Sequence, residues 1–196
     1  MMARYSSYTR DFLRVENDPG VVACRLNRMV CETDFDGHFI TLTVAILDLA
    51  SRQLTISSAG HPPILVRRGN GRVEEHGREV RGFPLGIEPS AVYDKALVCL
   101  APGDAILLYS DGVPDARNAN DDSFDTLRDP RLRNCLAATD GSPDVIGHTL
   151  VRQLQEFSNG CEQTDDIALV CFGPIAPPVQ DGVVDDLSIR TQGCLA

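Results

Sequence analysis

Residues 105–113 read Ala-Ile-Leu-Leu-Tyr-Ser-Asp-Gly-Val, an apolar run that ends abruptly in Ser-Asp-Gly. The apolar part predicts a buried strand. At the end of such a strand Asp111 has a fixed backbone and a partly desolvated carboxylate, which is costly unless a cation or several donors compensate it. The following glycine allows a turn without crowding the carboxylate. On its own, this stretch favours a simpler interpretation, in which Asp111 caps a following helix.

A second stretch of sequence makes a metal site at Asp111 the better interpretation. Residues 163–170 read Gln-Thr-Asp-Asp-Ile-Ala-Leu-Val and place Asp165 and Asp166 just before another buried strand. If the two strands run antiparallel, Asp111 and Asp165 share one edge of the sheet. Adjacent carboxylates repel one another, so such a cluster indicates a metal site, and oxygen ligands without Cys or His suit Mg²⁺ or Mn²⁺. Asp166 is equally interpreted as a loop residue that faces water, and Asp115 either reaches the same site or is an exposed helix residue.

A third stretch presents a histidine. Residues 57–63 read Ser-Ser-Ala-Gly-His-Pro-Pro, in which small residues and paired prolines predict a rigid turn between strands. His61 therefore has a fixed position, from which it could bind phosphate or relay a proton. It could equally be a structural histidine of the turn.

The rest of the chain predicts short strands with helices before and after them. Asp18-Pro19 starts one helix, with Asp as N-cap and Pro at the first helical position. Helical spacing predicts another helix at residues 143–157 and a return to helix directly after Asp111. Strands are predicted at residues 39–49, 54–58, 64–67, 96–100, 105–109 and 167–172. This order indicates an α+β domain with antiparallel sheet, because a parallel sheet needs a helix between successive strands.

Length and composition fit one domain with a tail. The 196 residues are 43% hydrophobic and 23% charged, which is enough for an ordinary core. We expect the domain over residues 1–173. Residues 174–196 open with Pro-Ile-Ala-Pro-Pro and continue as a polar, acidic segment, which predicts a disordered tail.

The net charge and the cysteine pattern argue against several classes of partner and against an oxidising compartment. The formal net charge of −10 argues against nucleic acid or an anionic membrane, because both are bound mainly through Lys and Arg. No apolar stretch is long enough to span a membrane, and the N-terminus lacks the pattern of a signal peptide. The seven cysteines include no Cys-x-x-Cys pair, which favours a reduced, cytoplasmic setting.

Five short motifs then occur in one order: Ala-Gly-His-Pro-Pro, Pro-Leu-Gly, Pro-Gly-Asp, strand-Ser-Asp-Gly-Val and Asp-Asp-Ile-Ala-Leu. With them, about residues 18–173 resemble the PPM-type metal-dependent serine/threonine protein phosphatases, in the bacterial branch of sporulation stage II protein E and sigma-factor regulators. The resemblance implies a four-layer α-β-β-α sandwich of antiparallel sheets. It also implies a binuclear Mn²⁺ or Mg²⁺ centre at one end of the sheets. Asp104 belongs to the Pro-Gly-Asp turn, and its expected role is in that turn.

The resemblance assigns roles to individual residues. Asp111 and Asp165 match metal-ligand aspartates of the family, and Asp166 lies beside the second of them. Asp115 matches an acidic position that helps to hold a more weakly bound metal. His61 matches a turn that is mainly structural in the family, and substrate binding is a second, weaker expectation for it.

The implied activity is hydrolysis by a metal-activated water. Two cations, about 3.5–4 Å apart, bind a bridging water and lower its pKa, and the resulting hydroxide attacks phosphorus in line. The expected substrate is phosphoserine or phosphothreonine on a regulatory protein of the anti-sigma-factor antagonist type. A homodimer is left open.

One part of the family pattern is absent. The family's core begins with a strand that ends in Gly-Asp-Val, followed by a Gly-His-Gly or Gly-Lys-Gly turn, and its Asp bridges both metals. This chain has no such segment, so the predicted domain is N-terminally incomplete; residues 36–38, Asp-Gly-His, resemble it only superficially. The chain is therefore a shortened phosphatase, a catalytically incomplete relative that acts as a binding or regulatory module, or a protein to which another chain supplies the carboxylate.

Overall fold

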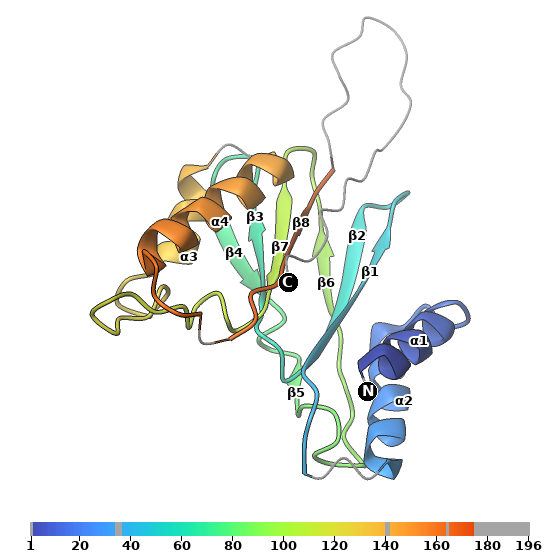
Figure 1. Ribbon diagram of the computed structural model, residues 1–196. Helices are drawn as coiled ribbons and strands as arrows, with labels where there is room; N and C mark the ends of the chain where they lie inside the picture. The colour runs from blue at the N-terminus through green and yellow to red at the C-terminus, as the bar shows by residue number, and fades with distance from the viewer. Residues whose placement is uncertain (1, 34–36, 140–141, 164, 175–196) are drawn as a thin grey trace, which may run out of the picture. The chain divides into compact units, whose positions relative to one another are not determined.

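The computed structural model describes residues 2–33, 37–139, 142–163 and 165–174. Contacts divide the chain into two compact units, each of which is described by itself. Unit 1 comprises Met1–Pro63 and His76–Cys99, and unit 2 comprises Ile64–Glu75 and Leu100–Ala196. Among the described residues each unit contains one sheet and two helices (Figure 1).

The sheet of unit 1 is built around β2. Its strands are β1 (Leu42–Asp48), β2 (Gln53–Ala59), β5 (Arg81–Gly82) and β6 (Ala96–Cys99). Both β1 and β6 pair with β2 in antiparallel orientation, and the short β5 pairs with it in parallel. The register of β1 and β2 runs from Leu42 opposite Ala59 to Asp48 opposite Gln53.

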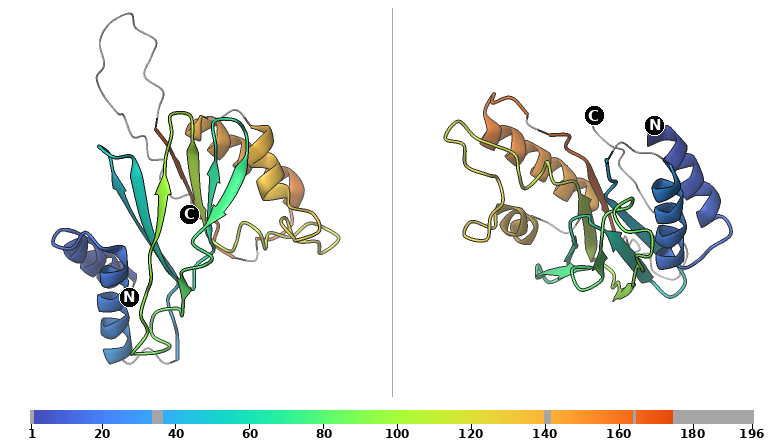
Figure 2. Two further views of the ribbon diagram at one scale, coloured as in Figure 1. Left: turned by 180° about the vertical axis from the view of Figure 1, so that it is seen from behind. Right: turned by 90° about the horizontal axis from the view of Figure 1, so that it is seen from below.

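Two helices complete unit 1. These are α1 (Met2–Leu13) and α2 (Pro19–Glu32); α2 lies against one face of the sheet and α1 packs on α2 (Figure 2). Asp18 caps α2 as predicted, since its side chain accepts hydrogen bonds from the N–H groups of Gly20 (2.9 Å) and Val21 (3.4 Å). The apolar side chains that join helix and sheet are Val22, Leu26 and Val30 on α2 with Val44, Ala59 and Leu85. Burial of each valine or leucine side chain in this set stabilises the fold by about 1.5–3 kcal/mol.

The sheet of unit 2 contains both predicted site strands. Its strand order is β4 (Val73–His76), β3 (Ile64–Arg67), β7 (Ala105–Tyr109) and β8 (Leu169–Phe172). β7 is antiparallel to β3 and to β8, and Tyr109 lies opposite Leu169. The start of β8 is therefore beside the end of β7, which confirms the predicted antiparallel pairing.

Helices α3 (Arg131–Ala138) and α4 (Pro143–Ser158) pack on this sheet (Figure 1). The core between them and the sheet contains Leu65, Leu107, Leu136, Ile146, Leu150 and Leu154. The two units thus contain the two helical layers and the two sheets of the predicted α-β-β-α fold. The predicted α+β class is confirmed.

Some sequence-based expectations were wrong in detail. Residues 111–115 form a turn, and the next helix begins only at Arg131, because Pro114 and a polar loop intervene. The first predicted strand begins at Leu42, while Ile40 makes only an isolated bridge to Leu85. The predicted tail lies outside the described residues from position 175 onward, so the domain boundary stays a prediction. No helix in the described ranges combines the length and the apolar composition that a membrane span requires.

Asp104 fixes the turn that leads into β7. It is 3% exposed, and its carboxylate accepts hydrogen bonds from the N–H groups of Gly69 (3.0 Å) and Ala101 (2.9 Å). The guanidinium of Arg68 donates a third (2.8 Å). These bonds tie the residues after β3 to the start of β7, in agreement with the expected turn role.

We expect Asp104→Asn to lower the free energy of unfolding by about 2 kcal/mol. A neutral amide cannot accept all three hydrogen bonds, so at least one of the three donors loses its partner on the buried Asp104 side chain. Denaturant unfolding measures the effect, and Asp121→Asn, at a side chain that is 90% exposed, is the matched control. Equal stability of the two variants would contradict this role of Asp104.

Candidate active site

Ser110 joins the two segments that carry the predicted site residues. It follows β7, and its backbone N–H donates to the carbonyl of Ala168 (3.0 Å), which continues the pairing of β7 with the chain before β8. Its hydroxyl donates to the carbonyl of Asp166 (2.8 Å) and accepts from the N–H of Ala168 (2.9 Å). One small side chain therefore holds the Asp165-Asp166 segment against the end of β7.

Gly112 brings the same two segments into backbone contact. A Cβ atom at this position would lie 2.4 Å from the carbonyl oxygen of Asp166 and 3.4 Å from that of Asp165. The first of these distances is shorter than non-bonded atoms allow, so no residue with a side chain fits without a shift of the backbone. The Ser-Asp-Gly motif thus requires glycine at position 112 because the backbone of Asp166 lies so close to it.

A turn over residues 111–115 presents the first two carboxylates. The N–H of Asp115 donates to the carbonyl of Asp111 (3.0 Å), and the N–H of Val113 donates to that of Ser110 (3.1 Å). Asp111 and Asp115 are both exposed. The simpler interpretation of Asp111 as a helix cap is wrong, because no helix follows before Arg131.

Asp165 and Asp166 present the other two carboxylates, and both residues are exposed. The carboxylate of Asp165 accepts a hydrogen bond from the N–H of Asp166 (2.7 Å). The side-chain amide of Gln163 donates to the carbonyl of Asp165 (2.6 Å). The first of these bonds orients the Asp165 side chain, and the second holds its backbone.

The four aspartates offer only oxygen ligands. This donor set fits Mg²⁺ or Mn²⁺, because such ions are commonly bound by one or two carboxylates and complete their shell with water. Within the described ranges, no three Asp, Glu, His or Cys side chains form a group that could hold a metal ion. The structure therefore joins the two carboxylate-bearing segments, and the metal-binding role of Asp111, Asp115, Asp165 and Asp166 stays a prediction.

His61 lies in unit 1, in the turn after β2. Its Nδ1 is 3.2 Å from Oγ1 of Thr41, and its carbonyl accepts a hydrogen bond from the hydroxyl of Ser58 (3.2 Å). Gly60, with a φ of 71°, has the left-handed conformation that this turn requires, and its N–H donates to the carbonyl of Gly82 (2.9 Å). These contacts support a structural role for the turn. Substrate binding by His61 stays a prediction.

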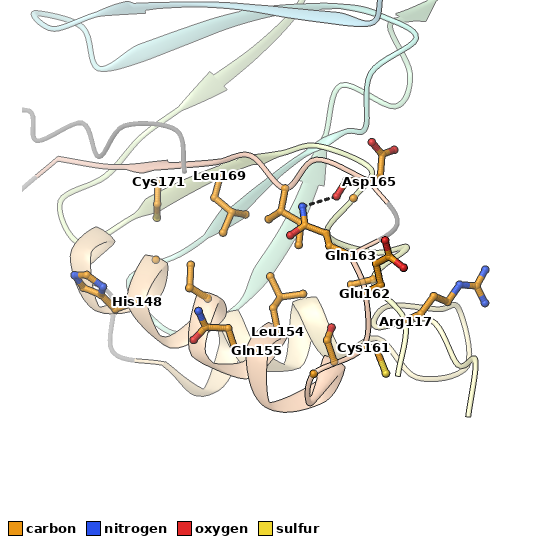
Figure 3. Close-up of a pocket in the computed structure, with 17 residues that line it drawn as sticks. Arg117, His148, Leu154, Gln155, Cys161, Glu162, Gln163, Asp165, Leu169 and Cys171 are labelled. Carbon is orange, nitrogen blue, oxygen red and sulfur yellow. Dashed lines mark hydrogen bonds between the residues drawn. The ribbon is translucent and has the colours of Figure 1, made fainter. Parts of the chain in front are cut away.

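A pocket of about 690 Å³ lies beside Asp165, between α4 and the segment that leads into β8. Glu162, Asp165 and Arg117 lie at one end of it and His148 at the other (Figure 3). The wall between these ends is mainly apolar. The pocket therefore extends from the candidate site along the side of α4.

Sequence reasoning missed this pocket, although a signal was present. Ile167, Leu169 and Cys171 recur at alternate positions, and all three line the pocket. Burial raises the pKa of the Cys171 thiol to about 12, so it stays neutral and contributes apolar surface.

Comparison with known proteins gives a family and a relative. A family model described as Stage II sporulation protein E (SpoIIE) matches residues 1–173. Phosphoserine phosphatase RsbU of Bacillus subtilis (strain 168) is 33% identical over 102 residues, which are 52% of this chain and 30% of RsbU. The chain spans less than a third of the length of the curated relatives that it matches.

Two solved structures share the fold. The RsbU and RsbW domains of Rv1364c from Mycobacterium tuberculosis align with a TM-score of 0.72 at 21% identity, over 90% of this chain and 47% of that one. The manganese-presoaked phosphatase domain of the cell fate determinant SpoIIE from Bacillus subtilis aligns with a TM-score of 0.62 at 16% identity. That alignment covers 90% of this chain and 76% of the SpoIIE domain.

Proposed function

This chain belongs to the stage II sporulation protein E family, and we propose that it hydrolyses phosphoserine or phosphothreonine on a regulatory protein with the help of a divalent cation. The junction at Ser110 and Gly112 carries the proposal. It holds the Asp111 turn against the Asp165-Asp166 segment at one end of the unit 2 sheet. The carboxylates of two segments joined this closely repel one another, and a bound cation would offset this repulsion.

Asp111 and Asp165 are the proposed principal ligands. Asp115 is proposed to help hold a more weakly bound ion, and Asp166 is proposed as a further ligand beside Asp165. Bound Mg²⁺ or Mn²⁺ supplies an activated water and neutralises charge on the phosphoryl oxygens. A solved SpoIIE phosphatase domain was presoaked with manganese, which supports this choice of ion.

The chain's own groups position this chemistry. Ser110 and Gly112 fix the backbones from which the aspartates project, so the spacing of the carboxylates does not depend on flexible loops. The hydrogen bond from the N–H of Asp166 orients the Asp165 carboxylate. All four aspartates are exposed, so a phosphorylated segment of another protein can approach them.

The proposed substrate is a phosphorylated regulatory protein of the anti-sigma-factor antagonist type. The name of RsbU, a phosphoserine phosphatase, supports phosphoserine as the substrate group. A cytoplasmic location, a homodimer and a contribution of His61 to substrate binding remain predictions.

A second function is a binding or regulatory module without turnover. One observation favours it: in the part of the chain that the structure describes, no three potential ligands form a metal-binding group. Such a module would bind the phosphorylated protein through the same surface and leave the phosphate in place.

Phosphate release from a phosphoserine peptide, with and without Mn²⁺, separates the two functions. We expect Mn²⁺-dependent release by the unchanged chain and a loss of about a hundredfold or more in Asp165→Asn. Asp121→Asn, an exposed aspartate of the same unit, should leave the rate unchanged. Equal, negligible rates from folded protein with and without Mn²⁺ would overturn the enzymatic function and favour the binding module.

A further inference from the structure

The loop between β7 and α3 extends away from the sheet of unit 2 (Figure 1). Its backbone is attached to the candidate site, since the N–H of Phe124 donates to the carbonyl of Ala116 (2.8 Å). The N–H of Asp125 donates to the carbonyl of Pro114 (3.1 Å), which belongs to the turn over residues 111–115 that presents two of the site's carboxylates. A protein whose phosphate reaches these carboxylates therefore also approaches the residues that follow Asp125.

The residues after Asp125 form a turn that hydrogen bonds close, which we call the 125–130 turn. Asp125 and Pro130 form an isolated β-bridge at its base. The N–H of Thr126 donates to the carbonyl of Asp129 (3.1 Å), and the N–H of Asp129 donates to the hydroxyl of Thr126 (2.9 Å). These bonds hold the backbone on both sides of the two residues at the tip.

Side chains hold the same turn against α3 and α4. The carboxylate of Asp125 accepts a hydrogen bond from the N–H of Leu132 (2.8 Å), in the first turn of α3. Arg131 donates through Nε to the carboxylate of Asp129 (2.6 Å), and its guanidinium lies 4.6 Å from the centre of the Phe157 ring. The turn is thus ordered before a partner arrives, so binding at its tip loses little conformational freedom.

The tip presents Leu127 and Arg128 to solvent. Leu127 is 103% exposed, so it contributes nothing to the core. Arg128 is exposed as well, and in the described part of the chain it makes no hydrogen bond or ion pair. A single apolar residue on a surface is ordinary. Here, however, an apolar and a cationic side chain stand together on an ordered turn that is attached to the candidate site, where they can bind an apolar and an acidic residue of a partner.

Position and charge together identify this partner. The turn adjoins a site whose proposed substrate is a phosphorylated regulatory protein, so that protein is brought to its tip. The cation at Arg128 suits the anionic segment that carries the phosphate. A second copy of this chain, with a net charge of −10, would instead be repelled by the exposed aspartates of the site.

We propose that the 125–130 turn is a docking element for the phosphorylated regulatory protein and that it recognises residues that flank the phosphoserine. Leu127 contacts an apolar residue of the partner, and Arg128 pairs with an acidic one. Both partner residues lie at a fixed spacing from the phosphoserine. The inference rests on the proposed function, because it takes the phosphorylated protein of that function as the partner, and it adds a sequence preference that contacts to the phosphate alone do not supply.

Binding of phosphoserine peptides tests this inference. An array presents peptides of about thirteen residues with phosphoserine at the centre, so that the six residues on each side reach about 20 Å. Each peptide contains one Leu and one Glu at varied positions in a background of Gly and Ser. The full chain is bound without added metal ion, so the phosphate stays in place. We expect one spacing of Leu and Glu to bind about tenfold more tightly than the background peptide.

Two substitutions assign this preference to the tip. Leu127→Ser should remove the preference for Leu in the peptide and weaken binding about tenfold. Arg128→Glu should reverse the charge preference, so that a peptide with Lys in place of Glu binds about fivefold better. Both positions are exposed, so the fold should persist. Arg72→Glu is the control, because Arg72 is 74% exposed and follows β3 at the opposite end of the unit 2 sheet.

Mn²⁺-dependent hydrolysis of an aryl phosphate, measured in the same proteins, separates this inference from the proposed function. The aryl phosphate is too small to reach the tip, so all variants should hydrolyse it at the rate of the unchanged chain. No hydrolysis, together with the expected peptide preference, would contradict the enzymatic function and support the docking turn. The docking turn is overturned if no spacing is preferred, or if Leu127→Ser and Arg128→Glu bind every peptide as the control does. It is also overturned if either substitution converts a dimer into a monomer, which would assign the tip to a second copy of the chain.

Discussion

Replacing Asp111 with asparagine is expected to lower Mn²⁺-dependent hydrolysis of an aryl phosphate about a hundredfold or more. Asn keeps the size of the side chain and removes the negative charge that attracts the cation. Because Asp111 is exposed and contributes its backbone carbonyl to the turn at Asp115, the substitution should leave the fold unchanged. A loss of rate would therefore result from the missing negative charge and not from unfolding.

Two controls make this prediction specific. The free energy of unfolding of Asp111→Asn, measured without metal, should equal that of the unchanged chain. Asp122→Asn, at another exposed aspartate of unit 2, should keep the full rate. A rate in Asp111→Asn that equals the rate of the unchanged chain would remove Asp111 from the site.

Replacing Gly112 with alanine is expected to have the largest effect on stability. The added Cβ would lie 2.4 Å from the carbonyl oxygen of Asp166, and this neighbour is backbone that cannot rotate away. Relief of the clash must separate the turn after β7 from the segment before β8 and so break the hydrogen bonds of Ser110. We expect a loss of about 3 kcal/mol in the free energy of unfolding, together with loss of metal-dependent activity.

Gly69→Ala is the matched control for this substitution. A Cβ at Gly69 would meet its nearest neighbour, the carbonyl oxygen of Pro102, at 3.5 Å, which is an ordinary contact. Its N–H, which donates to Asp104, would remain. Chemical denaturation of both variants measures the difference in the free energy of unfolding. Equal values for Gly112→Ala and Gly69→Ala would contradict the close approach of Gly112 to the carbonyl oxygen of Asp166.

The strands of the site were predictable because their sequence signals are strong and local. Residues 105–109 and 167–172 are nearly uninterrupted apolar runs, and an aspartate stands at the end of the first and just before the second. The interpretation of a shared site depended on the two strands being antiparallel, and the structure shows that they are. The N-cap at Asp18 was equally local, because the Asp-Pro pair marks a helix start.

Other features depend on contacts between distant segments, and the sequence alone does not define those. The close approach of Gly112 to Asp166 is a property of the packed backbone, so the glycine could be interpreted from sequence only as permission for a turn. The short β5 exists only because β2 offers it a partner. The pocket beside Asp165 likewise depends on the position of α4 relative to β8, which alternation in one strand does not predict.

The family resemblance was confirmed, yet it leaves the completeness of the site to experiment. Its motifs lie at Asp111 and at Asp165, and the fold places both motifs at one end of the unit 2 sheet. The capacity of these carboxylates to bind a cation is therefore the central claim.

Mn²⁺ binding, followed by electron paramagnetic resonance of the free ion during a titration, tests this claim most directly. The titration compares the unchanged chain with Asp111→Asn, Asp165→Asn and the control Asp121→Asn. We predict that the unchanged chain and the control bind Mn²⁺ equally, and that either of the other substitutions weakens binding about tenfold or more. Equal binding by all four proteins, or none by any of them, would contradict a cation site built from Asp111 and Asp165.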